Sequence, residues 1–522
     1  MIRLYRILFF MFVLAVFIVG IIYFIKRDVA VVIDKYTSIQ RLPNIKPDYK
    51  ETIIPPNIAP LNFLIEETGI HYYVKIYSVE GKGIELFSKE PKVIIPINPW
   101  RKMLGVNRGK EIYFDVYVYR ADGGWEKFDT FKNLISNEKI DGYLVYRLIR
   151  PLYSYWENIS IRQRNLENYD ESVVLSNKSI ESGCVNCHTF LNNSPNNMLM
   201  HVRSVPNPTM LLVRNGTVTS IFSQTPFSSA SMAYSSWHPS GRFVAFSVNK
   251  VNQFFHSAGA GIRDVVDRDS AIGIYDVESN TIITPASLSN SDFLETYPSW
   301  SPDGRYLYYC NAPIIWEDRN LVPPEDYEKV RYDLMRISFE PENGEWGEPE
   351  NVLLAKDTGL SITQPRISPD GRFLLFCMAD YGCFAIYQQS SDLYIMDLKT
   401  LQYKKLGINS DESDSWHCWS NNSRWIVFSS KRFANIFARP FFSYINKNGE
   451  PSKPILMPQK NPTFYDSYIM TYNVPEFITH PIQVSRREFE MAIHSPIKIT
   501  GVESVTSATP GTSSIPEPYR QK

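Results

Sequence analysis

One short pattern occurs four times in the second half of the chain. In each copy a strand-like segment ends in an aromatic or branched residue, a turn follows, and an alternating apolar segment comes next. The copies read SSWHPSGRFVAFSV, PSWSPDGRYLYYC, PRISPDGRFLLFC and HCWSNNSRWIVFSS, around Trp237, Trp300, Ile367 and Trp419. Each predicts a β-hairpin, and each is followed by a further strand pair. Four strands per unit, repeated about every 50–70 residues, are typical of the blades of a β-propeller.

A second motif, ESGCVNCHTF, precedes the repeats. Cys184, Cys187 and His188 form C-x-x-C-H, the attachment signal for c-type haem. Two thiols bond the two vinyl groups of one porphyrin, and the histidine binds the iron. A zinc site would need a second ligand pair, and the sequence has none at suitable spacing. A thioredoxin-like motif would need a βαβ context, which is not evident. The motif therefore predicts one covalently attached haem c.

The iron needs a sixth ligand or keeps an open position, and Met and His are the usual choices. Met198, Met200 and His201 lie within reach along the sequence. If NMLMHVR is a strand, the methionines share one face with Val202 and resemble sheet-to-sheet core, whereas His201 and Arg203 share the other. We therefore expect His201 to be the sixth ligand, with the two methionines as alternatives. Arg203 is a candidate partner for a haem propionate.

Two further histidines fall in the repeats. His238 replaces a turn serine and His417 precedes Trp419 by two residues, so both are candidate residues of the propeller channel, although a structural role is the commoner one. The other four cysteines give no metal-binding pattern. We expect them to be structural, with Cys377 and Cys383 as a candidate disulfide pair: Cys310, Cys377, Cys383 and Cys418.

The amino terminus carries an uninterrupted apolar segment. Ile7–Ile25 has no charged residue and would span about 28 Å as a helix, close to the hydrocarbon thickness of a bilayer. It ends in bulky residues rather than a small-residue cleavage site, which favours an uncleaved anchor. Flanking positive charges are balanced and do not set the orientation. Because c-type haem is attached outside the cytoplasmic membrane, we expect a single-pass protein whose bulk is periplasmic.

The segment after the anchor is rich in proline to about residue 60, and it reads as a linker. Alternating runs such as EIYFDVYVYR then predict a small antiparallel β-sandwich of immunoglobulin type, with no helical segment among its strands. The last residues, from about 496, are rich in Ser, Thr and Pro and predict disorder.

The S-P-D-G-R turns and their flanking strands resemble those of TolB-type β-propellers over roughly residues 230–460. The combination of anchor, sandwich, C-x-x-C-H-x-F…H-x-R and these repeats resembles a family of exported haem-motif propeller proteins, most of them without an assigned activity. That resemblance implies an all-β fold with six blades, although four repeats are obvious. Laying the haem segment over the repeat makes it the leading hairpin of blade one, with TMLLVRNGTVTSIF as the third and fourth strands. The closing blade is irregular.

The expected domain boundaries follow from these patterns. They are an anchor with its cytoplasmic stub at 1–27, a linker at 28–60, a sandwich at 61–155, a haem segment merging into the first blade at 156–203, a propeller at 204–480 and a carboxy-terminal extension at 481–522.

The expected function is electron transfer between a membrane-anchored monohaem cytochrome and a redox protein partner. A formal net charge of −1 gives no electrostatic reason to expect nucleic acid. Two alternatives stay open: a redox enzyme with a second site in the propeller channel, and an envelope binding scaffold with a structural haem. The sequence names no small-molecule substrate.

Overall fold

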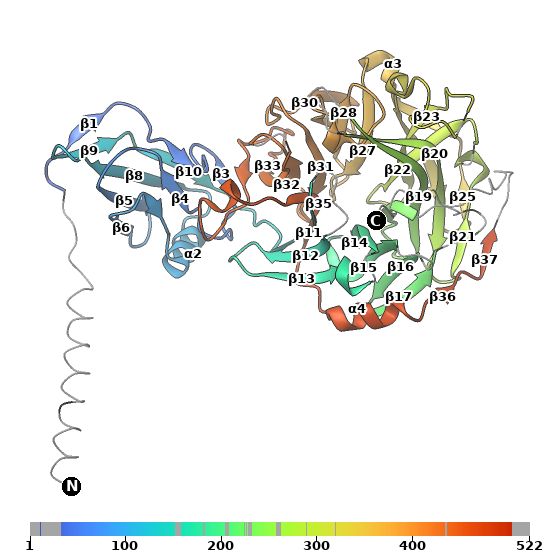
Figure 1. Ribbon diagram of the computed structural model, residues 1–522, viewed down its shortest axis with the longest axis horizontal. Coiled ribbons are helices and arrows are strands. Elements are labelled where there is room, and N and C mark those ends of the chain that lie inside the picture. Colours follow the sequence, from blue (N-terminus) through green and yellow to red (C-terminus); the bar gives the residue numbers. More distant parts are fainter. Residues whose placement is uncertain are drawn as a thin grey trace, which may run out of the picture.

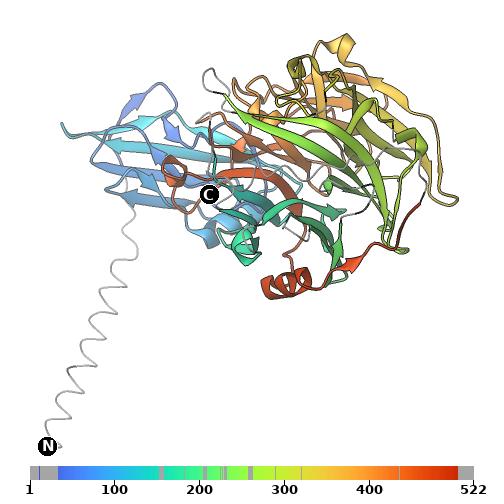
Figure 2. The ribbon, with the colours of Figure 1, turned by 45° about the vertical axis from the view of Figure 1, so that its right-hand side comes forward.

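The computed structural model describes residues 33–503, apart from 152–157, 181–182, 204–207, 224, 226, 228–231, 257–262, 289, 319 and 434–435, together with Met11. Regular structure in these residues is almost entirely β-strand. Figures 1 and 2 show a smaller amino-terminal β-domain beside a larger ring of sheets. No helix in the described part of the chain is long and apolar enough to cross a membrane. The predicted anchor at Ile7–Ile25 lies, except for Met11, outside the described residues.

The larger body is a β-propeller. Within the described residues, six sheets of four or five strands form it, and their innermost strands contact one another in a closed ring. The innermost strands are β14 (Cys184–Leu191), β18 (Met232–Trp237), β22 (Phe293–Trp300), β27 (Ser361–Ile367), β31 (Asp414–Trp419) and β35 (Thr471–Ile478).

Antiparallel strands extend each blade outward, and five blades take them from the sequence that follows the inner strand. These strands are β15 (Ser194–Arg203), β16 (Thr209–Arg214) and β17 (Thr217–Phe222) in the first blade, β19 (Phe243–Phe255), β20 (Arg263–Asp276) and β21 (Thr281–Ile283) in the second, β23 (Tyr306–Pro313), β24 (Asp333–Glu340), β25 (Glu345–Trp346) and β26 (Glu350–Leu353) in the third, β28 (Phe373–Ala379), β29 (Asp392–Asp397) and β30 (Gln402–Lys405) in the fourth, and β32 (Trp425–Ser430), β33 (Arg439–Tyr444) and β34 (Ile455–Leu456) in the fifth.

The sixth blade joins the two ends of the propeller sequence. Its inner strand β35 pairs antiparallel with β11 (Tyr143–Ile149), which is followed outward by β12 (Ile159–Asn165) and β13 (Glu171–Ser176). We expected the sandwich to run to residue 155, and this boundary is wrong. Tyr143–Ile149 alternates like a sandwich strand, but its pairing with β35 places it in the propeller.

The haem-motif segment forms the leading hairpin of the first blade, as the alignment with the repeats predicted. β14 and β15 pair through a tight turn at Asn192 and Asn193, both with positive φ. Asparagine tolerates that conformation better than most residues. The TMLLVRNGTVTSIF segment supplies β16 and β17.

The repeated S-x-D-G-R turn is held by its own side chains. In the fourth blade the Ser368 hydroxyl donates to the Asp370 carboxylate and accepts from the backbone N–H of Phe373, at 2.6 and 2.9 Å. The Asp370 carboxylate also accepts from the N–H of Arg372, and Gly371 takes a positive φ. The same serine–aspartate pattern holds the turn at Ser301 in the third blade. Local hydrogen bonds of this kind explain why the motif is readable in sequence.

The amino-terminal domain has two sheets around a shared apolar core. The strands are β1 (Thr37–Ile39), β3 (Ile53–Ile54), β5 (His71–Ser78), β6 (Ile84–Ser88), β8 (Glu111–Tyr119), β9 (Trp125–Phe128) and β10 (Phe131–Ile135) in one sheet, and β2 (Ile45–Lys46), β4 (Phe63–Ile65) and β7 (Lys92–Val93) in the other.

Three features of this domain differ from the sequence expectation. The first three strands fall within the expected linker at 28–60. β1 with β9, and β3 with β10, pair parallel rather than antiparallel, because the leading segment returns beside the hairpins. Helix α2 (Ile97–Val106) lies between β7 and β8 and buries Trp100 and Leu104, so the expectation of no helical segment among the strands is wrong.

The carboxy-terminal segment wraps the outside of the propeller. Helix α4 (Arg486–Ile493) begins with a capping box between Ser485 and Glu488 and packs on the first and sixth blades. β36 (Ile497–Lys498) adds to the outer edge of β17, and β37 (Gly501–Glu503) adds to β21. Disorder from about residue 496 is therefore wrong as far as Glu503, because backbone pairing and the packing of Ile499 and Val502 on the core order this segment. Residues 504–522 lie outside the described part of the chain. A short helix, α3 (Ala355–Thr358), precedes β27.

Because the pairing of β11 with β35 closes the ring, we predict that the core residues of β11 stabilise the whole propeller. Leu144 is fully buried in this strand opposite Phe477. Replacing it by alanine should lower the free energy of unfolding by about 2–5 kcal/mol, since lost burial and a cavity add. Urea unfolding followed by tryptophan fluorescence measures this. Leu134→Ala, at a position 39% exposed, is the control, and an equal loss in both variants would contradict the prediction.

Candidate functional site

The six innermost strands share a β-bulge at the same level of the channel. In each blade the register of the inner strand shifts against its neighbour at this point. The first bulge residue has a positive φ between 44° and 56° in every blade, and these residues are Cys187, Tyr234, Tyr297, Gln364, Trp416 and Val474. Bulges of this kind re-aim side chains and are common beside functional sites.

A positive φ is costly for residues other than glycine. Such a conformation costs about 1–3 kcal/mol where the surrounding structure enforces it. Val474, which is β-branched, is the least favourable of the six. Strain repeated around one ring marks the centre of the channel as a candidate functional site.

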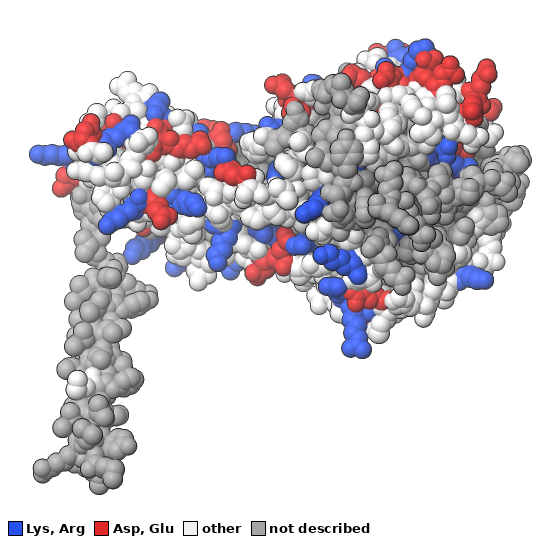
Figure 3. Space-filling model, in the orientation of Figure 1, with Lys and Arg blue, Asp and Glu red and all other residues white. Residues whose placement is uncertain are grey.

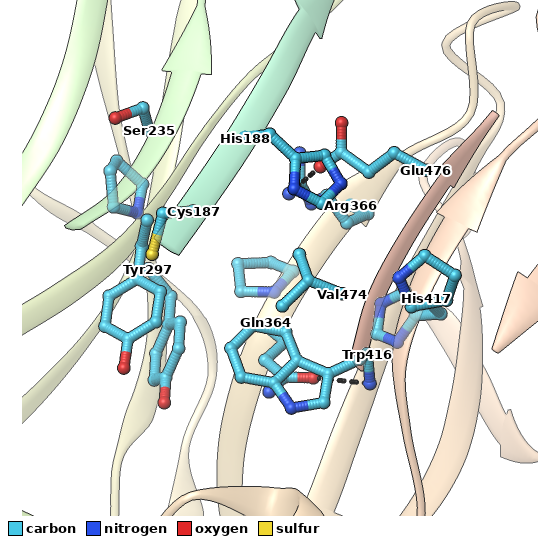
Figure 4. Close-up of a pocket in the computed structure, with 14 residues that line it drawn as sticks. Cys187, His188, Ser235, Tyr297, Gln364, Arg366, Trp416, His417, Val474 and Glu476 are labelled. Atoms are coloured by element: carbon cyan, nitrogen blue, oxygen red, sulfur yellow. Dashed lines mark hydrogen bonds and ion pairs between the residues drawn. The ribbon is translucent and has the colours of Figure 1, made fainter. Parts of the chain in front are cut away.

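The bulge residues and the residues after them line a cavity of about 40 Å³ (Figure 4). Its lining is Cys187, His188, Tyr234, Ser235, Tyr297, Pro298, Gln364, Pro365, Arg366, Trp416, His417, Val474, Pro475 and Glu476. All six blades contribute to it. Cys187 and His188 of the C-x-x-C-H motif therefore face the channel beside residues from the innermost strands of the other five blades.

His188 is buried without a hydrogen-bond partner on either ring nitrogen. Burial lowers its pKa to about 3, and the nearby charge of Arg147 acts in the same direction. The backbones of Val145 and Val474 lie close to the ring and oppose this shift, but neither makes a hydrogen bond of acceptable geometry to it. The imidazole is therefore neutral at physiological pH, as a metal ligand must be.

Both motif cysteines are free thiols. Cys187 is the buried bulge residue, and Cys184 begins the same strand. Burial raises the pKa of the Cys184 thiol, while Arg147 and Arg203 act in the opposite direction. Arg147 also donates a hydrogen bond to the side chain of Asn186, between the two cysteines. Two cationic side chains thus lie near the first thiol.

These residues fit a covalent haem by their chemistry. Two free thiols and an unpartnered neutral imidazole are the donor set that c-type attachment uses. The space is smaller than a porphyrin needs, since organic cofactors occupy pockets of about 300–1,000 Å³. The lining side chains would have to move apart to admit one. Within the described residues, no group of three or more His, Cys, Asp or Glu side chains could hold a metal ion by itself.

The structure does not bring His201 together with His188. Asn186 pairs with His201 and His188 with Met200, so the two histidines lie on opposite faces of the hairpin. His201 is buried with its Nε2 atom 2.7 Å from the Ser235 hydroxyl in the second blade. Burial lowers its pKa to about 3. The assignment of His201 as sixth ligand stays a prediction, and it would require this hairpin to change its pairing.

The other candidates near the motif lie as the strand alternation predicted. Met198 and Met200 are fully buried with Val202 in the apolar core between the first and sixth blades. Arg203 ends β15 opposite Cys184. It lies close enough to His201 to contribute to the lowering of that pKa.

The two channel candidates separate in the structure. His417 lines the cavity, with its Nε2 atom 3.1 Å from the carbonyl oxygen of Leu375, and burial lowers its pKa to about 3. His238 lies outside the cavity at a hairpin turn. Its Nδ1 atom is 2.7 Å from the Ser240 hydroxyl and its Nε2 atom 3.1 Å from the carbonyl oxygen of Gly304. His238 thus has a structural role, because one ring nitrogen holds its own turn and the other bonds the neighbouring blade.

The remaining cysteines are free and buried or half-buried. Cys377 donates to the amide oxygen of Gln364, and Cys383 to the carboxylate of Asp264, so the candidate disulfide is not formed. Burial raises the pKa of both thiols. They are protonated, as expected of structural cysteines.

An ion pair spans the cavity wall between the fourth and sixth blades. Arg366 donates to Glu476 at 3.0 Å, shown as a dashed line beside His188 in Figure 4. Glu476 is buried, and burial raises the pKa of its carboxyl to about 7 against the opposing effect of Arg366. The carboxyl therefore changes its charge near neutral pH.

Sequence reasoning missed most of the cavity lining. Tyr234, Tyr297, Gln364 and Trp416 each lie three positions before the residue on which the repeats were aligned. The common offset of three positions was the only sequence feature that these residues share. It could not predict a shared position in the channel, because in a regular strand a residue three positions earlier faces the other side of the sheet.

No protein-family profile and no curated protein sequence matches this chain. Among solved structures, a Dos1 propeller is 13% identical over 44% of this chain and 63% of its own, with a TM-score of 0.27. An ACO/RPE65 chimera is 10% identical over 84% of this chain and 97% of its own, with a TM-score of 0.36. A nidogen/laminin complex is 6% identical over 65% of this chain and 100% of the matched one, with a TM-score of 0.35. Likeness at this level carries no argument about function.

The raised pKa of Glu476 predicts a pH-dependent stability. Between pH 4.5, the ordinary pKa of a glutamate, and about 7, the folded state holds a proton on Glu476 that the unfolded state has lost. This proton binding stabilises the fold fully below that range, and the stabilisation is lost as pH rises through it. Glu476→Gln removes the titration. The free energy of unfolding of the wild type should fall more steeply over this range than that of the variant, by up to about 1.4 kcal/mol per pH unit. The prediction is refuted if the free energy of unfolding depends on pH in the same way in the wild type and in Glu476→Gln. It is also refuted if the exposed control Glu345→Gln loses as much of the pH dependence.

Proposed function

We propose that the protein is a membrane-anchored, exported c-type cytochrome with one covalent haem, which exchanges electrons with a protein partner. The observation that carries the proposal is the C-x-x-C-H motif on an innermost propeller strand, with His188 buried and unpartnered at both ring nitrogens. A buried imidazole without partners costs free energy unless a ligand satisfies it. Cys184 and Cys187 would hold the porphyrin, and His188 would bind its iron.

The haem, when bound, would supply a one-electron couple. The chain's own residues set its surroundings. The burial that keeps His188 neutral provides an iron ligand at any physiological pH. Arg147 and Arg203, both near Cys184, are suited to pairing with propionate groups. The apolar core between the first and sixth blades, which includes Met198 and Met200, limits water on that side.

The resemblance to TolB-like propellers with a haem motif supports the same proposal. It implies export and anchoring by Ile7–Ile25, with the bulk of the chain in the periplasm. Figure 3 shows acidic and basic side chains interspersed over the visible described surface, in keeping with a partner recognised through a local site rather than bulk charge.

A second candidate is a redox enzyme whose second site lies in the propeller channel. The observation that favours it is the cavity itself, in which His417, Arg366 and Glu476 lie in the same lining as the haem motif. Turnover of a substrate by the purified haem protein, lost in His417→Ala with the haem retained, would favour this reading over electron transfer alone. A scaffold with a structural haem would instead show no reversible redox couple.

Covalent attachment predicts a haem that follows the polypeptide through denaturation. After expression in a host competent for c-type maturation, haem-peroxidase stain should coincide with the full-length band on a denaturing gel. Changing Cys184 and Cys187 to serine should abolish the stain, because no thioether bond can form. Cys418→Ser is the matched control and should keep it. An unstained wild-type band would overturn the proposal.

The anchor predicts a defined topology. Protease added to spheroplasts should digest most of the chain, and the undigested protein should stay in the membrane fraction after alkaline carbonate. Mass spectrometry should find the terminus at Met1. Full protection from protease, or a mature terminus near residue 26, would contradict an uncleaved anchor with a periplasmic bulk.

A further inference from the structure

One wall of the channel cavity carries hydrogen-bond donors that the protein leaves unused. The side-chain nitrogen of Gln364 and the indole nitrogen of Trp416 are buried without a partner. Both residues line the cavity, and both are first residues of a bulge with positive φ, at 56° and 47°. An unused buried donor costs about 1–3 kcal/mol. Two unused donors, on residues that both have a positive φ, indicate a ligand with acceptor atoms.

The orientation of the Gln364 amide is fixed by its neighbours. Its oxygen accepts from the backbone N–H of Trp416 at 2.9 Å and from the thiol of Cys377 at 3.5 Å. A backbone N–H can only donate, so the amide oxygen must face it. The amide NH₂ group is then committed to the other side, where it has no acceptor. Gln364 is 6% exposed, so bulk water does not supply one.

The charges and the size of the cavity narrow the ligand further. Arg366 adds a guanidinium to the same lining, two residues after Gln364 on β27, and it is paired with Glu476. His417 is neutral there, because burial lowers its pKa. One water needs about 10–15 Å³ in a cavity. A volume of about 40 Å³ therefore suits a ligand of about three non-hydrogen atoms.

We infer that the cavity wall formed by Gln364 and Trp416, with Arg366 elsewhere in the same lining, binds a small oxyanion, of the size of formate. The two unused N–H donors would bond its oxygens, and the guanidinium would offset its charge when the neighbouring Glu476 carboxyl holds its proton. β27 and β31 belong to the fourth and fifth blades, whereas the haem motif lies on β14 of the first blade. The inference thus concerns residues other than the haem-attachment residues, but the two sets line one cavity, so its size argument applies to that cavity without haem.

Calorimetric titration of the purified, detergent-solubilised full chain with sodium formate tests the inference. Saturable binding at one site per chain is expected. Trp416→Phe keeps the ring and removes only the indole N–H, and Gln364→Glu keeps the oxygen that faces Trp416 and removes the NH₂ group. Each should weaken formate binding at least about tenfold, as expected for loss of a hydrogen bond to a charged group. Gln402→Glu introduces the same change on the exposed outer strand of the same blade and should bind as the wild type does.

Two outcomes overturn the inference. One is the absence of saturable formate binding both to the wild type and to the haem-free Cys184→Ser/Cys187→Ser chain. The other is wild-type affinity in folded Trp416→Phe and Gln364→Glu chains, with unchanged melting temperature as the check on folding. The same titration of the Cys184→Ser/Cys187→Ser chain separates this inference from the proposed function. Formate binding there supports the anion site even if the haem stain shows that the native chain holds no haem.

Discussion

The pairing of β35 with β11 is the interaction on which the rest of the structure depends. It joins strands more than 300 residues apart and turns an open row of blades into a closed ring. Without it, the first and fifth blades would each expose the face that packs on the sixth, and the channel would have no sixth wall. Val474, Pro475 and Glu476 reach the cavity only because this strand lies there. Closure and the candidate site are thus parts of one arrangement.

The ring imposes the same local distortion on six different sequences. Each inner strand bulges at one level and places its first bulge residue in a left-handed conformation. In five of the blades this residue is Tyr, Gln, Trp or Val, and in the first it is Cys187 of the haem motif. The residue after it is histidine in two blades and proline in three. The fold therefore supplies six equivalent positions, and the sequence has filled them with groups of differing chemistry.

The placement of the haem motif on a strand has a consequence for its geometry. In a regular strand, positions 184 and 187 would face opposite sides of the sheet. The bulge at Cys187 inserts one residue and changes that relation, and it also puts His188 on the face of Met200. His201, which the sequence favoured as the sixth ligand, falls on the opposite face and contacts the second blade. The channel lining combines uncharged and charged groups. The uncharged groups include the buried imidazoles of His188 and His417, and the charged ones are the Arg366–Glu476 pair.

Features with local causes could be read from the sequence. The four repeat hairpins, the hairpin register of the haem segment and the packing of Met198 and Met200 all follow from turn chemistry and strand alternation, which act over a few residues. The boundary of the propeller and the fate of residues 497–503 could not be read, because both depend on pairing with distant strands. The cavity residues Gln364, Trp416 and Glu476 carry no motif, since their meeting requires six blades to close and bulge at one level. Sequence alone determined the blade unit and the haem motif, whereas the tertiary structure decided which side chains share the channel, because only ring closure brings inner strands from the whole chain to one axis.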